Sequence, residues 1–199
     1  MNFTVVTRFF DAPAVSRKEI FRYAGCREGD SKVRELMEAC LREAEDQLSY
    51  RVCYCKLPVA IQNDTLDFGV FSFYSSSLAK NLIGCNEAVF FAATVGIELD
   101  RQIERYSRLS PSKAVMLDAI GAERIEALCD AFCRDFSEEE KVFFAPRFSP
   151  GYGDLPLEAQ RDIFAVLGCE KRIGLALNDS LLMSPSKSVT AIVGIKEKR

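Results

Sequence analysis

Residues 87–96, EAVFFAATVG, form an almost unbroken apolar run in the middle of the chain. A strand with one face in water alternates apolar and polar side chains, whereas a strand covered on both faces is apolar throughout. The run is also too short for a membrane-spanning helix, which needs about 20 apolar residues. We therefore expect residues 87–96 to form the central strand of a sheet that is covered on both faces.

The segments around this run predict helices and further strands in no regular alternation. Helices are expected at residues 16–25, 30–48, 75–85, 110–136 and 155–168, the last capped by Asp154. Strands are expected at residues 2–10, 51–61, 66–73 and 142–145, with two more around the turn at 184–187. This order favours an α+β fold with a central mixed, largely antiparallel, twisted sheet flanked by helices. With 199 residues and no linker segment, residues 1–199 are expected to form a single domain.

Residues 110–136 give the clearest helical pattern. Pro111 suits the first turn of a helix that begins after Ser110, and apolar or small residues recur at helical spacing. These residues are Leu117, Gly121, Ile125, Leu128, Phe132 and Phe136. The small residues in the stripe predict close packing against a neighbouring element rather than chemistry.

Composition excludes several classes of function. The net charge of −3 disfavours a general nucleic-acid binder, because phosphate affinity depends on an excess of lysine and arginine. No segment has the apolar length of a membrane span, and the first residues lack the pattern of a secretory signal. We expect a cytoplasmic protein without a membrane or nucleic-acid partner.

The chain contains no histidine and eight cysteines. Without histidine, Ser-His-Asp and Cys-His nucleophilic sites and the commonest general base near neutral pH are missing. The cysteines form no CxxC pair, so structural thiols are favoured over metal ligands. A thiol-based redox or metal protein that uses Cys129 and Cys133, one helical turn apart, remains an alternative.

Residues 145–160, APRFSPGYGDLPLEAQ, concentrate prolines and glycines around one arginine and one tyrosine. Such a stretch is usually a surface turn. It could instead hold a small ligand with a carboxylate, because the Arg147 guanidinium can bind a carboxylate with two hydrogen bonds. The rigid backbone at Pro150 and Gly151 would lose little entropy on binding.

Two segments carry a resemblance to a known family. RFSPGYGDLP resembles the RPxPGYxxxP signature of the reactivation domain of cobalamin-dependent methionine synthase, and LNDSLLMSPSKSVTAIVGI is similar to that domain's C-terminal pattern. The helical segment LDAIGAERIEAL is similar to the family's central helix. The early SRKEIFRYAG and the later AVFFAATVGIELD resemble short, free-standing bacterial relatives of this domain. The resemblance spans most of residues 16–195 and implies the fold of that activation domain.

The resemblance implies an activation subunit for a cobalamin-dependent methionine synthase that lacks its own reactivation domain. Such a subunit binds S-adenosylmethionine, whose methyl group traps the partner's cobalamin after a flavodoxin-like or other donor has reduced the inactive cob(II)alamin. The cobalamin is carried by the partner, so this chain is an accessory part of a methyltransferase without a complete active site. A need for positioning rather than acid or base groups agrees with the lack of histidine.

The resemblance also assigns roles to the residues of the loop. Arg147 is expected to hold the ligand's carboxylate, and the main chain at Ser149 to meet the adenosyl portion. Tyr152 is expected to pack on the ligand, while Pro150 and Gly151 shape the loop. No catalytic or metal-binding residue is implied.

This sequence departs from the family pattern in three places. Phe148 stands where the signature has proline. No residue clearly matches the family's N-terminal acidic group that meets the ligand's amino group. The family's larger domains also continue beyond the position that matches Arg199. The alternative is therefore a non-catalytic module that docks on a corrinoid methyltransferase without binding S-adenosylmethionine.

Overall fold

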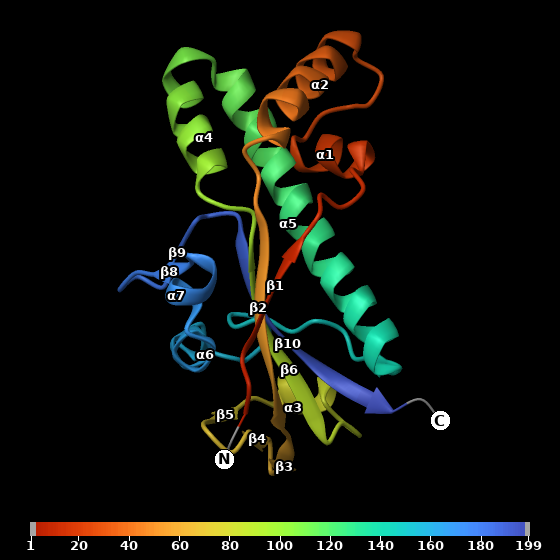
Figure 1. Cartoon of the computed structure of the whole chain (residues 1–199), viewed down its shortest axis with the longest axis vertical. Helices are drawn as coiled ribbons and strands as arrows, with labels where there is room; N and C mark the ends of the chain where they lie inside the picture. Colours follow the sequence, from red (N-terminus) through yellow and green to blue (C-terminus); the bar gives the residue numbers. More distant parts are fainter. Residues whose placement is uncertain (1–2, 198–199) are drawn as a thin grey trace.

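A five-stranded sheet forms the centre of the computed structural model, which describes residues 3–197 (Figure 1). Its strand order is β1-β2-β6-β10-β7, and all neighbouring strands are antiparallel. The strands are β1 (Val6–Phe10), β2 (Tyr50–Pro58), β6 (Glu87–Thr94), β7 (Val142–Phe144) and β10 (Ser188–Glu197). The predicted α+β fold with a largely antiparallel sheet is confirmed, and the apolar run is its middle strand β6. Residue 2, the start of the first predicted strand, lies outside the described residues.

Both faces of β6 are buried, as its composition predicts. Val89, Phe91 and Ala93 belong to one apolar core, and Ala88, Phe90 and Ala92 belong to a second core on the other face. Because side chains alternate along a strand, two helical layers are needed to cover a strand of this kind. The sheet therefore separates two cores.

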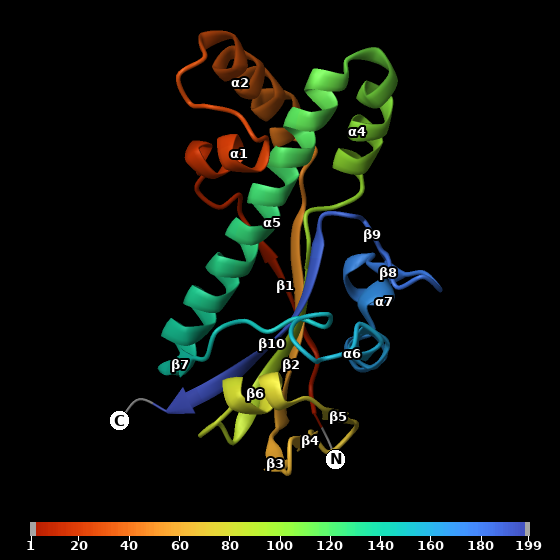
Figure 2. The same cartoon turned by 180° about the vertical axis from the view of Figure 1, so that it is seen from behind.

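Seven helices within residues 3–197 provide these layers. They are α1 (Arg17–Tyr23), α2 (Ser31–Glu45), α3 (Ser76–Asn81), α4 (Glu98–Leu109), α5 (Pro111–Glu140), α6 (Ala159–Leu167) and α7 (Cys169–Ile173). The long helix α5 runs along one side of the sheet, with α1, α2 and α4 around its first half, whereas α6 and α7 lie on the other side (Figures 1 and 2). In the described part of the chain, every helix is too short or too polar to cross a bilayer.

The predicted stripe of α5 is confirmed, because its six residues are all buried. At Gly121, an added Cβ would lie 2.5 Å from a methyl carbon of Leu99 on α4 and 2.8 Å from the Lys187 side chain. Gly121 thus allows α4 to pack closely on α5. The helix runs to Glu140 rather than ending near 136, since the charge run after Phe136 continues the last turns.

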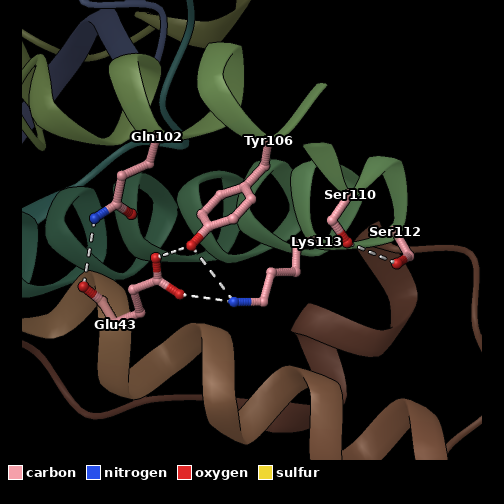
Figure 3. A network of polar contacts seen from close by, with 6 residues as sticks. All are labelled: Glu43, Gln102, Tyr106, Ser110, Ser112 and Lys113. Carbon is pink, nitrogen blue, oxygen red and sulfur yellow. Dashed lines mark hydrogen bonds and ion pairs between the residues drawn. The ribbon is translucent and has the colours of Figure 1, made fainter. Parts of the chain in front are cut away.

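Helix α4 was not predicted from the sequence. Only Leu99 is fully buried in it, and most of its other side chains are charged or polar. A polar network holds it to its neighbours (Figure 3): the Glu43 carboxylate of α2 accepts hydrogen bonds from the Tyr106 hydroxyl and, at 3.0 Å, from Lys113 Nζ of α5. The Gln102 amide also donates to the main-chain oxygen of Glu43 at 3.4 Å. Tertiary polar contacts thus support a helix that buries little apolar surface.

Two smaller sheets differ from the sequence predictions. The expected strand 66–73 is broken into β4 (Thr65–Asp67) and β5 (Ser72–Tyr74), which pair with each other while β4 also pairs with β3 (Ala60–Gln62). Gly69, at φ +79°, makes the turn between them. Near the C-terminus, β9 (Met183–Ser184) pairs with β8 (Ala176–Leu177) rather than with β10.

Candidate functional site

The 147–153 loop leaves the short edge strand β7 and continues along the edge of the sheet (Figure 2). The main chain of Phe148 exchanges two hydrogen bonds with Ile192 of β10, at 2.9 and 2.8 Å. Neighbouring residues of an extended segment point to opposite faces. Accordingly, Phe148 packs on the core that faces α6, and the Arg147 side chain contacts α5.

Arg147 is bound to two carboxylates of α5. Its Nη2 lies 2.8 Å from Glu126 Oε2 and 3.1 Å from Asp130 Oδ1, while its Nη1 is buried without a hydrogen-bond partner. Burial works against the charge of the guanidinium, but neighbouring Cys129 and Glu126 favour it, so the Arg147 pKa lies above its ordinary value. Arg147 is thus a charged group, 27% exposed, with one donor nitrogen unused.

The rest of the loop is a tight turn. Gly151 has φ +86°, the Tyr152 N–H donates to the Ser149 carbonyl at 3.0 Å, and Pro150 is buried. Tyr152 is 70% exposed, and its ring meets the Phe148 ring edge-on at a centroid distance of 6.2 Å. The left-handed backbone at Gly151 therefore favours glycine at this turn. The binding roles of Arg147, Ser149, Pro150, Gly151 and Tyr152 stay predictions.

Tyr152 and Arg147 lie on different sides of the sheet edge. Tyr152 follows the Phe148 ring, on the face of α6, whereas Arg147 binds α5. Within residues 3–197, no hydrogen bond joins the Arg147 side chain to Ser149 or Tyr152. A ligand that touched all three would have to cross this edge.

Asp154 does not cap the helix that follows it, so that prediction was wrong. Helix α6 begins after Glu158, and the Asp154 carboxylate instead accepts hydrogen bonds from the start of α3. These donors, the Ser75 hydroxyl foremost, hold the pKa of the Asp154 carboxyl well below its usual range. A local pattern could not indicate this contact, because its partners lie 77 to 79 residues away.

A groove of about 520 Å³ opens beside the carboxylates that hold Arg147. It lies between α1, the segment before it and α5, and its lining includes Tyr23, Glu123, Glu126 and Asp130. Glu123 is already used, since it accepts from the Ser16 N–H at 2.8 Å and from Arg124 Nε at 2.6 Å. Glu126 and Asp130 therefore have Arg147 on one side and open space on the other.

Comparison with known proteins gives a structural likeness and no match in sequence. No family model and no curated protein matches the sequence. Among solved structures, the chain is similar to the crystal structure of the MetH reactivation domain bound to AdoHcy, with a TM-score of 0.77 and 14% identity. The match covers 98% of this chain and 79% of that one. The chain has the reactivation-domain fold.

Phe148, at the position where the resembled signature has proline, makes two contacts that attach the loop to the sheet. Its N–H donates to the Ile192 carbonyl at 2.9 Å, a bond that proline cannot make. Its ring packs on the core that faces α6. The main-chain bonds of Phe148 fix the start of the loop to β10.

Of the two cysteines of the thiol-based alternative, Cys129 is buried and Cys133 is half-buried. Burial raises the pKa of the Cys133 thiol to about 11 and that of Cys129 as well. A thiolate is the reactive and metal-binding form, so both thiols are poor nucleophiles near neutral pH. Within residues 3–197, no three His, Cys, Asp or Glu side chains are grouped as metal ligands would be.

Sequence reasoning did not identify Glu126 or Asp130 as site residues. Both lie on the polar side of α5, 21 and 17 residues before Arg147, where charged residues are usually solvated. Their spacing of four gave a weak signal, because it places two carboxylates on one helix face.

Proposed function

We propose that this protein binds S-adenosylmethionine and supports the reductive methylation of inactive cob(II)alamin in a partner cobalamin-dependent methionine synthase. Two independent features support the proposal. The RFSPGYGDLP sequence resembles the family's ligand signature, and the chain shares its fold with a reactivation domain whose crystal structure contains AdoHcy. The electron donor would be a flavodoxin-like or similar reductant.

The observation that carries the proposal is the unused nitrogen of Arg147. A buried guanidinium nitrogen without a partner is costly, and a carboxylate would satisfy it with a charge-assisted hydrogen bond. The methionyl end of S-adenosylmethionine provides such a carboxylate next to an ammonium group. We assign the carboxylate to Arg147 and the ammonium to Glu126 and Asp130, which line the adjacent groove.

This assignment matches the charges present at the site. Two carboxylates face one guanidinium, so the cluster has an excess negative charge of one. A ligand end that carries one negative and one positive charge leaves this balance unchanged. Its carboxylate adds a contact to the unused nitrogen of Arg147, and its ammonium adds one to the carboxylates of the cluster.

The residues of the chain would act by holding and orienting the ligand. S-adenosylmethionine supplies both the methyl group and its own leaving group when it is bound, so no proton donor or acceptor from the protein is required. Tyr152, exposed at the loop tip, would provide a flat surface for the adenosyl portion, whose main-chain contact we assign to Ser149.

Isothermal titration of the purified protein with S-adenosylmethionine tests the proposal. We expect a saturable, one-site binding heat, and S-adenosylhomocysteine should bind as well because it has the same charged end. Absence of heat at millimolar ligand would contradict the proposal.

A second candidate is a non-catalytic module that docks on a corrinoid methyltransferase and binds no S-adenosylmethionine. It is favoured by the two ion pairs of Arg147, which already neutralise the guanidinium without a ligand. This candidate predicts binding to the corrinoid partner that is unaffected by S-adenosylmethionine. A pull-down with and without the ligand separates it from the first proposal.

A further inference from the structure

The short helix α3 is attached to both ends of the 147–153 loop. At its last residue, Asn81 Nδ2 donates to the Pro146 carbonyl at 3.2 Å, just before the loop begins. At its first turn, α3 binds the carboxylate of Asp154, just after the loop ends. Both ends of α3 therefore bind the residues that flank the loop, with one hydrogen bond at Pro146 and several at Asp154.

The contact at Asp154 is extensive for a single side chain. Its two oxygens accept four hydrogen bonds, from the Ser75 hydroxyl at 2.5 Å, the Ser76 N–H at 2.8 Å, the Ser76 hydroxyl at 2.9 Å and the Ser77 N–H at 3.1 Å. The approach is also close. At Gly153, φ is +55° and an added Cβ would lie 2.7 Å from Ser77 Oγ, so this position strongly favours glycine.

Contacts are unevenly distributed along the 147–153 loop. Its first two residues are held by the ion pairs of Arg147 with α5 and by the two main-chain bonds between Phe148 and Ile192. Residues 149–153 have main-chain bonds of the turn, from Gly151 N–H to the Leu155 carbonyl at 2.9 Å and from Leu155 N–H to the Tyr152 carbonyl at 3.0 Å, besides the Tyr152 bond to Ser149. The exposed Tyr152 ring adds only its edge contact with Phe148. The shape of residues 149–153 therefore depends on how the chain is held on either side, by Arg147 and Phe148 before the turn and by Asp154 after it.

We propose that Asp154 is a positioning residue, which with Asn81 holds the 147–153 loop against α3 in its binding shape before any ligand arrives. This inference rests on the proposed function, because the ligand it serves is S-adenosylmethionine. A loop that is already ordered loses less conformational entropy on binding, so the attachment increases affinity without touching the ligand. Asp154 corresponds to an unspecified position of the RPxPGYxxxP signature.

The effect of losing Asp154 should be local. Asp154 is exposed and lies outside both apolar cores, so its removal leaves the packing of the sheet and helices intact. We expect Asp154→Ala to weaken S-adenosylmethionine binding about tenfold, because binding would then have to order a loop and one or two side chains that Asp154 no longer holds. The midpoint of global thermal unfolding should change little.

Hydrogen–deuterium exchange of the ligand-free protein, followed by mass spectrometry of peptides covering residues 146–155, tests the attachment directly. Asp154→Ala should raise exchange in these peptides about tenfold or more, and Asp154→Asn, which replaces one acceptor oxygen by a donor group, should have an intermediate effect. Asp162→Asn, an exposed aspartate on α6, is the matched control and should exchange like the unaltered protein. Ser76→Ala combined with Asp154→Ala should have no larger effect than Asp154→Ala alone, because the two share their hydrogen bonds.

The possible outcomes separate this inference from the proposed function. Unchanged loop exchange in Asp154→Ala would overturn the attachment, whatever the ligand result. Faster exchange with unchanged S-adenosylmethionine affinity would overturn the positioning role. If the unaltered protein bound no S-adenosylmethionine, the proposed function and the positioning role would both fail, while the exchange data would still decide whether Asp154 holds the loop. Faster exchange together with weaker binding, at an unchanged unfolding midpoint, supports the inference.

Discussion

Two of the ion clusters that involve helix α5 differ in how completely their charges are paired. In the Glu43 cluster (Glu43, Tyr106, Lys113), one lysine faces one carboxylate and the tyrosine hydroxyl donates to the same carboxylate (Figure 3). In the Arg147 cluster (Arg147, Glu126, Asp130), one arginine faces two carboxylates, and Nη1 of the arginine is buried without a partner.

The difference separates a structural contact from a candidate binding site. The charges of the Glu43 cluster satisfy one another and join α2, α4 and α5. The unpaired buried atom beside this cluster is neutral: it is Oε1 of Gln102. The Arg147 cluster still has groups available for further hydrogen bonds. Nη1 of the arginine has no partner, and the two carboxylates line a groove. Unused polar capacity of this kind indicates where a ligand could contribute.

Replacement of Arg147 and of Lys113, the cations of the two clusters, should give the largest difference in ligand affinity. Arg147→Ala should weaken S-adenosylmethionine binding about 100-fold or more, because it removes the charge-assisted bonds to the ligand carboxylate. Lys113→Ala should leave the affinity within about twofold. Titration calorimetry measures both, and circular dichroism should show the same helical content in each. Similar affinities in the two variants would mean that the Arg147 cluster is structural as well.

The carboxylates of the Arg147 cluster should have a smaller, ligand-specific effect. Glu126→Gln combined with Asp130→Asn should weaken S-adenosylmethionine about tenfold, because the ammonium loses its charged acceptors. Methylthioadenosine lacks the amino-acid end, so its weaker binding should not change in this variant. Equal loss for both ligands would show that the variant disturbs the loop rather than the ammonium contact.

The Glu43 cluster should affect stability instead. Glu43→Gln should lower the free energy of unfolding by about 0.5–1 kcal/mol, a modest effect because both charged partners are about one-third exposed. Chemical denaturation gives this number, and S-adenosylmethionine affinity is the control that should stay constant. A loss of affinity here would remove the contrast between the clusters.

The smallest expected effect is that of mild acid. The Tyr106 hydroxyl and Lys113 hold the pKa of the Glu43 carboxyl below its ordinary value, so its stabilising contribution is fully present above the unfolded-state pKa of about 4.3. It is lost as pH falls from there through the lower folded-state pKa. Stability from this cluster should therefore be constant between about pH 7 and pH 5, and Glu43→Gln should flatten the decline below about pH 4. If the contribution of Glu43 to the free energy of unfolding, taken from the difference between the unaltered protein and Glu43→Gln, began to decline near pH 6, this explanation would be wrong.

The sequence predicted the parts of the fold that depend on apolar periodicity. The run at 87–96 and the stripe of α5 each required a particular burial pattern, and both are where the pattern places them. The missed helix α4 had a usable signal, since Leu99, Ile103 and Tyr106 follow helical spacing. Its many charges obscured that signal.

Contacts between distant polar residues could not be predicted in the same way. Asp154 had a plausible local role as a helix cap, yet its carboxylate binds α3, which the chain forms 77 to 79 residues earlier. In the sequence, Glu126 and Asp130 are typical of a solvated helix face. Only the tertiary structure shows that Arg147 lies beside them. Candidate residues within one loop are thus visible in the sequence, whereas their partners depend on the tertiary structure.

The most direct test of the central claim is a pair of titrations with S-adenosylmethionine, one on the unaltered protein and one on Arg147→Ala. Saturable heat in the first and none in the second would support a ligand site at the Arg147 cluster. Heat of equal size in both would place the site elsewhere, and no heat in either at millimolar ligand would contradict S-adenosylmethionine binding by this protein.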